Sequence, residues 1–271
     1  MPELAEVAYF CGRWNPGIGQ RVKAVYLNPK ARVGRGLNSR HLAESLVGQT
    51  LKASRTSGKQ MAFIFSGGTW LGIHLGMTGR LEAGDAEREP TPYDHLKLTM
   101  ANGRELIFVD PRQFGRVQSW TGEGEPSWWA KIPPAILSAE FNVKKLTDYL
   151  KRRQRAPIKA VLLQQEAFPG IGNWMADEVL WRAGFHPAAL AGNFGPQAIK
   201  KLHRTLKQVC RDAMRVIGKD WSDPPNQWLF NHRWKDGGIC PRTKKPLHRE
   251  DLRGRTTCWS PTWQKLGAER R

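Results

Sequence analysis

The chain has 271 residues, of which 40% are hydrophobic, and it carries 43 Lys and Arg against 24 Asp and Glu. This length suits one or two domains with an appendage, and the absence of any run of about 18 apolar residues excludes a transmembrane helix. The net charge of +19 is spread over the chain, which favours a nucleic-acid-binding protein; a merely basic, ribosome-like protein is the alternative. Because the N-terminus has no apolar signal-peptide core, we expect the protein to stay inside the cell.

The first residues of the chain are Met1, Pro2 and Glu3, and they suggest an amine nucleophile. Because an initiator Met is usually removed when a small residue follows, we expect Pro2 to become the mature N-terminus. A free α-amine has a pKa of about 7.7–8, so a useful fraction is neutral near pH 7 and can attack an electrophilic carbon. Attack of this secondary amine on a sugar carbon gives an iminium that has no N–H to lose and therefore remains an electron sink.

Apolar residues after this opening recur at helical spacing, which predicts a helix with one buried face. Pro2 suits the first helical position because its missing N–H would be unpaired there. The positive end of the helix disfavours protonation of the amine and favours Glu3 as an anion. An ordinary helix start is the alternative interpretation of these residues taken alone. The buried face consists of Leu4, Val7, Ala8 and Cys11.

Residues 21–110 have the pattern of strands joined by tight turns. One hairpin is predicted over 59–75 and another over 95–109, the second with alternating apolar and polar residues. An all-β sandwich behind the first helix fits this pattern. Lys59 stands at the start of a strand, where an isolated Lys is normally a solvated surface residue.

Two glycine-flanked loops each contain an apolar residue that a tight turn can present to solvent. An exposed Met77 would act as a wedge that fills the gap left when a nucleotide leaves the DNA stack, and the second loop offers Phe114 as another apolar residue. Taken singly, each of these two residues would more often belong to a core. The loops are His74-Leu75-Gly76-Met77-Thr78-Gly79 and Asp110-Pro111-Arg112-Gln113-Phe114-Gly115.

A domain boundary is predicted at residues 121–137, which contain Gly, Pro and Glu and few periodic signals. Ser138 is then a candidate N-cap for the first of several helices. The glycines of Gly170-Ile171-Gly172-Asn173 allow close approach of backbone N–H groups, and the N-terminus of the following helix attracts phosphate. We expect Gly184 to end that helix and Pro196 to open a long one. A simple glycine-rich connection is the alternative.

Together these motifs resemble the formamidopyrimidine-DNA glycosylase / endonuclease VIII family, and the resemblance covers almost the whole chain. The opening differs from the family's Pro-Glu-Leu-Pro-Glu-Val in Ala5, which replaces the second Pro. Gln113 replaces the second Arg of the family's Asp-Pro-Arg-Arg-Phe-Gly, which bears on contacts with the opposite base. The most specific internal match is residues 170–178, which follow the family's helix–two-turn–helix signature.

The resemblance implies that the protein flips a damaged nucleotide out of the duplex and excises its base. Pro2 would attack the anomeric carbon, Glu3 would protonate the sugar ring oxygen, and Lys59 would stabilise charge near the sugar and its phosphates. The resulting cationic Schiff base would permit strand cleavage by β-elimination and then δ-elimination.

The resemblance also implies a set of DNA contacts. Arg112 would pair with the orphaned base, while Phe114 and Met77 would occupy the space of the flipped nucleotide. The remaining matched positions are Lys159, Asn173 and Arg255, which would contact phosphates, and Glu6, which would lie near the lesion pocket.

The tail resembles the family's zinc finger but lacks its ligands. That finger uses Cys-x-x-Cys twice, because structural zinc needs four ligands at such spacing. Here Thr243, Ser260 and Trp263 stand where three of those cysteines would be, and only Cys240 remains. We therefore expect no metal and a zincless finger that is held by hydrophobic packing. The alternative is an improvised site that uses Cys240, Cys258, His248 and His232.

We therefore predict a monomeric α+β protein that needs no cofactor and binds double-stranded DNA with oxidised bases or abasic sites. A catalytically silent DNA-binding protein on the same scaffold and a basic RNA-binding protein are the alternatives. Residues 218–232 do not match the purine-capping loop that we would expect, so the choice between oxidised purines and pyrimidines stays open. The predicted parts are a catalytic β-sandwich domain (1–120), a linker (121–137), a helix–two-turn–helix domain (138–225) and a zincless β-hairpin finger (226–271).

Overall fold

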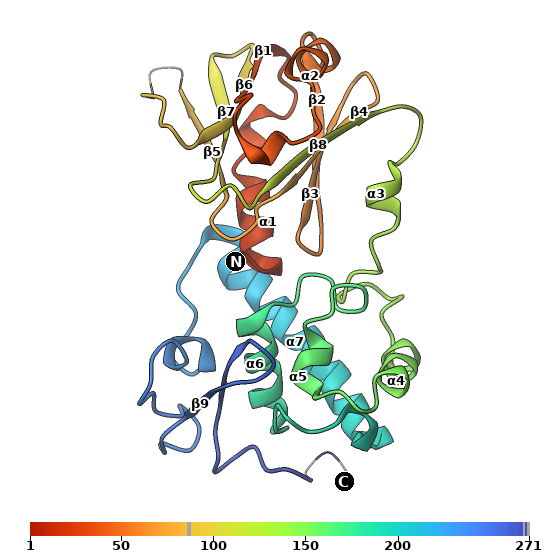
Figure 1. Ribbon diagram of the computed structural model, residues 1–271, viewed down its shortest axis with the longest axis vertical. Coiled ribbons are helices and arrows are strands. Elements are labelled where there is room, and N and C mark those ends of the chain that lie inside the picture. Colours follow the sequence, from red (N-terminus) through yellow and green to blue (C-terminus); the bar gives the residue numbers. More distant parts are fainter. Residues whose placement is uncertain (86–87, 268, 270–271) are drawn as a thin grey trace. The chain divides into compact units, whose positions relative to one another are not determined.

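The computed structural model shows a chain that folds as two compact units (Figure 1). The first unit consists of Met1–Pro2 and Glu6–Ile132, and the second of Glu3–Ala5 and the chain from Pro133 onward. The predicted α+β class is confirmed, since a β-rich first unit is followed by a mainly helical second one. The structure describes residues 1–85, 88–267 and 269.

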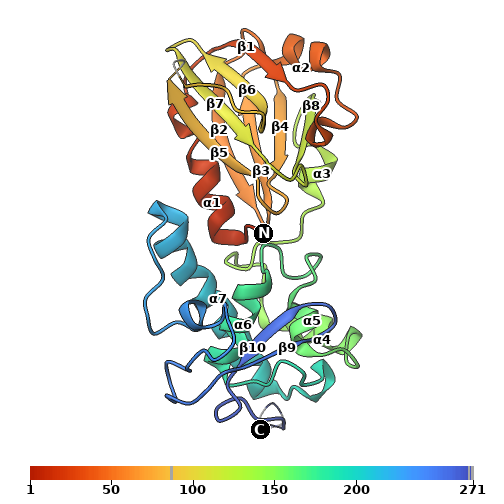
Figure 2. The same cartoon turned by 60° about the vertical axis from the view of Figure 1, so that its left-hand side comes forward.

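Two four-stranded antiparallel sheets make up the first unit, and they form the predicted β-sandwich (Figure 2). In spatial order the first sheet contains β1 (Val22–Leu27), β6 (Asp94–Met100), β7 (Arg104–Val109) and β5 (Arg80–Asp85). The second contains β2 (Leu51–Ser57), β3 (Gln60–Phe65), β4 (Thr69–His74) and β8 (Arg116–Thr121).

The core of the first unit lies between these sheets and is completed by α1 (Leu4–Gly12) and α2 (Ser39–Leu46). Trp14, which follows α1, is fully buried, and its ring centroid lies 4.6 Å from that of Phe63. Its Nε1–H donates to the carbonyls of Glu82 and Ile107 at 3.1 and 3.3 Å. The buried indole N–H is therefore satisfied, which avoids the cost of desolvating it without a partner.

The pairing register places three loops at one end of the sandwich. In the second sheet His74 pairs with both Gln60 and Arg116, so the β2–β3 turn lies at the end of the sheet where β4 ends and β8 begins. In the first sheet Arg80 pairs with Val109. The loop that joins His74 to Arg80 and the loop that joins Val109 to Arg116 therefore lie at this same end.

The stretch assigned to the linker contains a short helix, α3 (Ser127–Ala130), that groups with the first unit. The ring centroid of Trp129 lies 6.0 Å from that of Trp70 on β4, and the Arg55 guanidinium lies 5.5 Å from the Trp129 ring. Four helical residues give no readable periodicity, so the sequence pattern missed this element. The chain passes to the second unit after Ile132.

Helices form most of the second unit. Ser138 was a wrong choice of N-cap, because the first of these helices is capped by Asn142, whose side chain accepts from the N–H of Lys145 at 3.0 Å. Gly184 ends a helix with φ of +73°, as expected of a C-terminal glycine. The helices are α4 (Val143–Arg152), α5 (Ile158–Leu162), α6 (Asn173–Ala183) and α7 (Pro196–Asp220).

The long helix α7 opens at Pro196, as predicted, and its buried stripe faces the core of the second unit. This stripe contains Ile199, Leu202, Leu206, Val209, Cys210, Ala213 and Ile217. Short 3-10 helices occur at η1 (Asn15–Gly17), η2 (Arg32–Gly34), η3 (Ala191–Asn193) and η4 (Leu229–His232). Among the described helices, none is both long and apolar enough to cross a membrane.

The finger is an antiparallel hairpin of β9 (His248–Asp251) and β10 (Thr256–Trp259), with its tip at residues 252–255. Strand β10 lies beside α6 in the second unit (Figure 2). Within this strand Thr256 is exposed, whereas Thr257 and Cys258 are buried. The register of this strand therefore decides which finger side chains point outward.

Candidate functional site

Lys59 lies in the β2–β3 turn, directly after Gly58, whose φ of +59° favours glycine. Its Nζ lies 3.9 Å from Sδ of Met1, so the first unit places this cation beside the first residues of the chain. Lys59 and Pro2 are both partly buried. The nitrogen of Pro2 is in the peptide bond with Met1 here, and removal of Met1 would convert it to an amine.

One buried carboxylate joins the two glycine-flanked loops, 75–79 and 110–115, which we call the probe loops. Oδ1 of Asp110 accepts from the Thr78 hydroxyl at 2.7 Å, and Oδ2 accepts from the N–H of Gly115 at 2.7 Å. The Asp110 carbonyl oxygen lies 2.9 Å from Nε2 of His95. Because Asp110 is fully buried, replacing it would leave several donors unsatisfied, and the probe loops therefore depend on it as a pair.

Glycine is required where the probe loops touch. Gly76 has a φ of +64°, and a Cβ at this position would clash with the backbone of Phe114. A Cβ at Gly115 would clash with the ring of Phe108. The glycines therefore allow close approach of the two loops as well as the turns that the sequence suggested.

Both apolar residues at the tips of the probe loops are exposed, as the functional interpretation requires. Met77 is 40% exposed and Phe114 is 54% exposed, although residues of these types usually belong to a core. The Arg112 guanidinium lies 4.9 Å from the Phe114 ring centroid, which is cation–π geometry. The structure thus brings Arg112 and Phe114 together at one end of the sandwich.

Gln113 is held by the protein in a way that the sequence did not indicate. It has a φ of +53°, and its Oε1 accepts from the N–H of Arg32 at 2.9 Å. This bond joins the second probe loop to η2. The side chain that replaces the family's second Arg is therefore bonded to the backbone of the first unit.

In the second unit, the carboxylate of Glu3 lies at the start of α6. It accepts from the N–H groups of Gly172 and Trp174 at 2.9 Å each and from that of Met175 at 3.1 Å. Glu3 is only 4% exposed, and the positive end of the helix dipole stabilises its negative charge. The N–H groups that the sequence assigned to phosphate binding hold this carboxylate instead.

The backbone after Glu3 is fixed to the same turn. The N–H of Leu4 donates to the carbonyl of Gly170 at 3.0 Å. A Cβ on Gly172 would clash with the carboxyl group of Glu3, so the glycine leaves the space that this carboxylate occupies. The Gly-Ile-Gly-Asn turn is therefore built around the N-terminal residues of the chain.

The three residues expected at phosphates lie around β10. Nδ2 of Asn173 and Nζ of Lys159 both donate to the carbonyl of Thr256, at 2.9 and 2.8 Å. Arg255 is exposed at the finger tip. Lys159 is only 1% exposed, and its ammonium is surrounded by protein oxygens, so this geometry does not support a direct phosphate contact by Lys159.

Glu6 and Trp221 are the two residues that bear on the predicted lesion pocket. Glu6 is partly buried in the first turn of α1, within the first unit. Trp221 begins the loop that the sequence associated with the lesion pocket; it is 47% exposed and has a φ of +60°. This left-handed conformation ends α7, where the Trp221 N–H donates to the carbonyl of Ile217 at 3.0 Å. The exposed ring makes Trp221 a candidate for base stacking that the sequence did not indicate.

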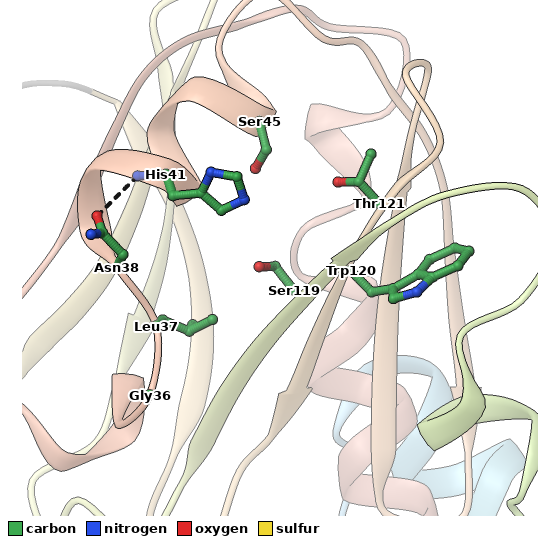
Figure 3. Close-up of a pocket in the computed structure, with 8 residues that line it drawn as sticks. All are labelled: Gly36, Leu37, Asn38, His41, Ser45, Ser119, Trp120 and Thr121. Atoms are coloured by element: carbon green, nitrogen blue, oxygen red, sulfur yellow. Dashed lines mark hydrogen bonds between the residues drawn. The ribbon is translucent and has the colours of Figure 1, made fainter.

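A pocket of about 620 Å³ on the first unit lies away from these residues (Figure 3). It lies between α2 and β8, and Thr121 on its rim pairs with Thr69. That pair marks the end of the second sheet opposite to the pair His74–Arg116. The pocket therefore lies away from the probe loops and Lys59. Its lining consists of Gly36, Leu37, Asn38, His41, Ser45, Ser119, Trp120 and Thr121.

The finger positions that correspond to zinc ligands do not fit zinc. Cys240 Sγ is buried and accepts from Trp181 Nε1 at 3.4 Å and from the N–H of Thr243 at 3.5 Å. Burial alone would raise the pKa of Cys240, but hydrogen bonds from Thr243, Ser260 and Trp181 outweigh it and lower the pKa to about 7. Nε1 of Trp263 donates to the carbonyl of Trp181 at 2.6 Å. Two hydroxyls and an indole do not replace thiolate ligands.

The alternative ligand set does not converge either. Nε2 of His232 lies 2.8 Å from the carbonyl oxygen of Asn226, and His248 packs edge-on against Trp259 with ring centroids 5.5 Å apart. Burial raises the pKa of Cys258 to about 12, as for an ordinary interior thiol. Within the part of the chain that the structure describes, no group of three or more His, Cys, Asp or Glu could hold a metal ion.

Comparison with known families decides the membership of the chain. Residues 1–117 match the formamidopyrimidine-DNA glycosylase N-terminal domain, and residues 132–223 match the formamidopyrimidine-DNA glycosylase H2TH domain. The chain belongs to the formamidopyrimidine-DNA glycosylase family. It is 31% identical to the formamidopyrimidine-DNA glycosylase of Roseiflexus sp. (strain RS-1) and 33% identical to that of Thermus thermophilus. Each alignment covers 98% of this chain and 100% of the relative.

Solved structures of the family have the same fold. The MutM (Fpg) protein of Thermus thermophilus is 31% identical, with a TM-score of 0.80, over 98% of this chain and 100% of that one. A complex of Lactococcus lactis Fpg with abasic-site DNA is 25% identical, with a TM-score of 0.85, over 97% and 99% of the two chains. The resemblance inferred from the sequence is therefore confirmed for family and fold.

Asp110 belongs to one of the loop motifs identified in the sequence, but its role as the connection between the probe loops was not predicted. A signal was available, because an Asp at a strand end before Pro commonly accepts from backbone N–H groups two or more residues on. The partner Thr78 was not predictable, since the two residues meet only when β4 and β7 are placed in their sheets.

Replacement of Gly172 by Ala tests the anchor of Glu3. The new Cβ would displace the carboxylate from the start of α6. We therefore expect the free energy of unfolding to fall by about 1–2 kcal/mol, as when a helix cap is removed. We also expect base excision to fall about tenfold, because the N-terminal residues lose their fixed position. Gly84→Ala is the matched control, since a Cβ there meets only the Arg88 side chain, at 3.8 Å. If the two variants have equal stability and activity, Gly172 is not needed to hold the Glu3 carboxylate at the start of α6.

His74 predicts a pH effect on the first probe loop. Burial lowers the pKa of His74 from its usual 6.5, and the Lys59 cation lowers it further. Its Nδ1 accepts from the N–H of Gly76 at 3.1 Å, which requires an unprotonated nitrogen. The unfolded chain therefore binds the proton more tightly, so stability is lost as the pH falls below about 6.5 towards the lower pKa of the folded protein.

We expect His74→Asn, which retains an acceptor without titrating, to reduce the loss of unfolding free energy between pH 7.5 and pH 5 by about 1 kcal/mol. Urea unfolding at the two pH values measures this difference. His41→Asn is the control, because His41 is exposed on α2. If both variants keep the full pH dependence of the parent, His74 is not its source.

Proposed function

We propose that this chain, acting as a monomer, excises oxidised bases from double-stranded DNA and then cleaves the strand through a Schiff base on Pro2. Membership of the family makes the chain a DNA glycosylase of damaged-base repair. Support for the substrate comes from Lactococcus lactis Fpg, whose solved complexes include abasic-site DNA and DNA that contains an oxidised pyrimidine. The net charge of +19 suits a polyanionic partner.

The observation that carries this proposal is the arrangement on both sides of Pro2. Before it, Met1 lies against the ammonium of Lys59 in the first unit. After it, three backbone N–H groups in the second unit hold Glu3. An amine freed at Pro2 would therefore start from a defined position, and positioning of this kind is a large part of covalent catalysis.

In the proposed reaction, the Pro2 nitrogen bonds to C1′ of the damaged nucleotide as the bond from C1′ to the base breaks. The electron pair leaves with the base, which takes up a proton. After the attack, the Pro2 nitrogen loses its N–H proton to the Glu3 carboxylate, and Glu3 passes this proton to O4′ as the C1′–O4′ bond opens to give the cationic iminium. Loss of a proton from C2′ then expels the 3′ phosphate, a second elimination expels the 5′ phosphate, and water hydrolyses the iminium to regenerate Pro2.

The probe loops account for access to the damaged nucleotide. Met77 and Phe114 enter the space that the flipped nucleotide vacates, and Arg112 faces the orphaned base. Lys59 supplies positive charge near the sugar and its phosphates as the base departs. Asn173 and Arg255 bind the DNA backbone, and Glu6 lies near the lesion pocket. A cleavage panel of oligonucleotides with single lesions separates oxidised purines from oxidised pyrimidines.

Borohydride trapping on an abasic-site duplex tests the nucleophile. We expect the parent protein, with Met1 removed, to give a covalent adduct. Pro2→Gly should lower the rate of adduct formation at least about tenfold, because a primary amine forms an imine that can lose its proton. Mass spectrometry of the trapped species must place the sugar on residue 2. A pure DNA-binding protein gives no adduct, and a Pro2→Gly variant that reacts as fast as the parent would exclude this mechanism.

We further propose that the finger folds and binds DNA without zinc, held by the bonds around Cys240 and Trp181. Treatment with a chelator should leave the melting temperature and DNA binding unchanged. Cys240→Ala should lower the free energy of unfolding by about 1–3 kcal/mol, because the Trp181 indole and the Thr243 N–H lose their buried acceptor. Cys258→Ala, a substitution in the same apolar cluster, should lower the free energy of unfolding by less than Cys240→Ala does. Chelator-induced unfolding, or stoichiometric zinc in the purified protein, would refute this proposal.

A further inference from the structure

The second unit contains a buried cluster of three charged side chains. Nζ of Lys159 lies 2.7 Å from Oδ1 of Asp177, and Nη2 of Arg233 lies 2.6 Å from Oδ2 of the same carboxylate. The side chains of Lys159, Asp177 and Arg233 are 1%, 0% and 4% exposed. Two buried cations on one carboxylate are a poor source of stability, because desolvation opposes their attraction, so the cluster calls for another explanation.

The polar atoms of this cluster are directed at β10 of the finger. Oδ2 of Asp177 accepts from the N–H of Cys258 at 3.0 Å. Nζ of Lys159 donates to the carbonyl of Thr256 at 2.8 Å and to the hydroxyl of Thr257 at 2.9 Å. The cluster therefore bonds three successive residues of the strand.

The chain of bonds continues to the finger tip. The Thr257 hydroxyl, which accepts from Lys159, donates in turn to the carbonyl of Arg255 at 2.9 Å. The Thr256 carbonyl, which accepts from Lys159, also accepts from Nδ2 of Asn173 at 2.9 Å. The exposed Arg255 and the first residue of α6 are thus fixed to the same short piece of backbone.

We propose that the buried Lys159–Asp177–Arg233 cluster is a positioning device that fixes the register of β10, so that Arg255 and Asn173 face the same stretch of DNA backbone. This inference deepens the proposed function and rests on it. Arg255 makes the phosphate contact, and Lys159 acts through Thr257 without touching DNA.

The geometry of a strand explains why register must be fixed. A shift of one residue would turn the Thr257 side chain to the other face of the hairpin and break the bonds of the Thr256 carbonyl to Lys159 and Asn173. The finger has only four residues in each strand, and its residues do not fit the zinc that would otherwise join its two halves. Bonds to β10 from Lys159 on α5 and from Asn173 and Asp177 on α6 supply this constraint, and Arg233 holds the Asp177 carboxylate in place.

A double-mutant cycle on binding tests the proposal. Thr257→Val removes the hydroxyl that joins Lys159 to Arg255 but keeps the side-chain shape and the other two contacts of Lys159. Thr256→Val is the matched control, because the Thr256 side chain is exposed one residue away. The dissociation constant of the full-length protein is measured for a duplex with a tetrahydrofuran abasic analogue, for each variant with Arg255 and with Arg255→Ala.

We expect Thr257→Val to weaken binding about tenfold when Arg255 is present and less than about twofold in the Arg255→Ala background, the non-additivity of coupled residues. Thr256→Val should change binding less than about twofold in both backgrounds. Equal weakening by Thr257→Val in both backgrounds, or no weakening in either, overturns the proposal.

Arg233→Lys gives a second route if Thr257→Val does not fold. It keeps the charge but loses the two-pronged contact with Asp177, so it should show the same dependence on Arg255, and additive effects would again overturn the proposal. Binding to an uncleavable duplex does not need Pro2, so this cycle is independent of the trapping experiment. Saturating concentrations of either variant should still give the borohydride adduct with an abasic site.

Discussion

The carboxylate of Glu3 accepts three backbone N–H groups at the start of α6, and the position of the N-terminal residues in the second unit depends on this one interaction. Glu3 and Gly172 are separated by 169 positions, yet neither fits without the other: the carboxylate needs donors once it is buried, and only glycine leaves room for it. The opening of the chain and its most specific internal motif are therefore two halves of one structure. Whatever chemistry occurs at Pro2 begins from a backbone that is anchored one residue away.

Two more buried carboxylates have the same kind of role. Asp110 joins the two probe loops, and Asp177 joins α6 to the finger. In a chain with 43 basic and only 24 acidic residues, most acidic side chains have cations available at the surface, so a buried acid that accepts backbone N–H groups indicates a structural connection. Glu3, Asp110 and Asp177 each join segments that are distant in sequence, and each lies directly behind residues proposed to meet DNA.

Local patterns in the sequence predicted the elements, whereas most residues of the candidate site were predicted from the resemblance to the family. Hairpin turns, the stripe of α7 and the glycine at the end of α6 follow from spacing and from backbone chemistry, and the structure confirms them. The N-cap of α4 was misplaced because Ser138 and Asn142 are equally good caps by residue type. The burial of Lys159 could not be predicted, since it depends on Asp177, Arg233 and β10 meeting in space.

The finger residues at the positions that match zinc ligands make other contacts, and these contacts join the finger to the helical unit. Four zinc bonds make a finger a self-contained module, because the metal joins its two halves directly. In this chain two of the corresponding positions, Cys240 and Trp263, bond to Trp181 on α6, and β10 bonds to Asp177 on the same helix. The finger is therefore an extension of the helical unit, and α6 carries Asn173 at one end and supports the hairpin along its length. A substitution inside α6 should therefore change the position of the finger tip. A zinc-bound finger does not require this coupling.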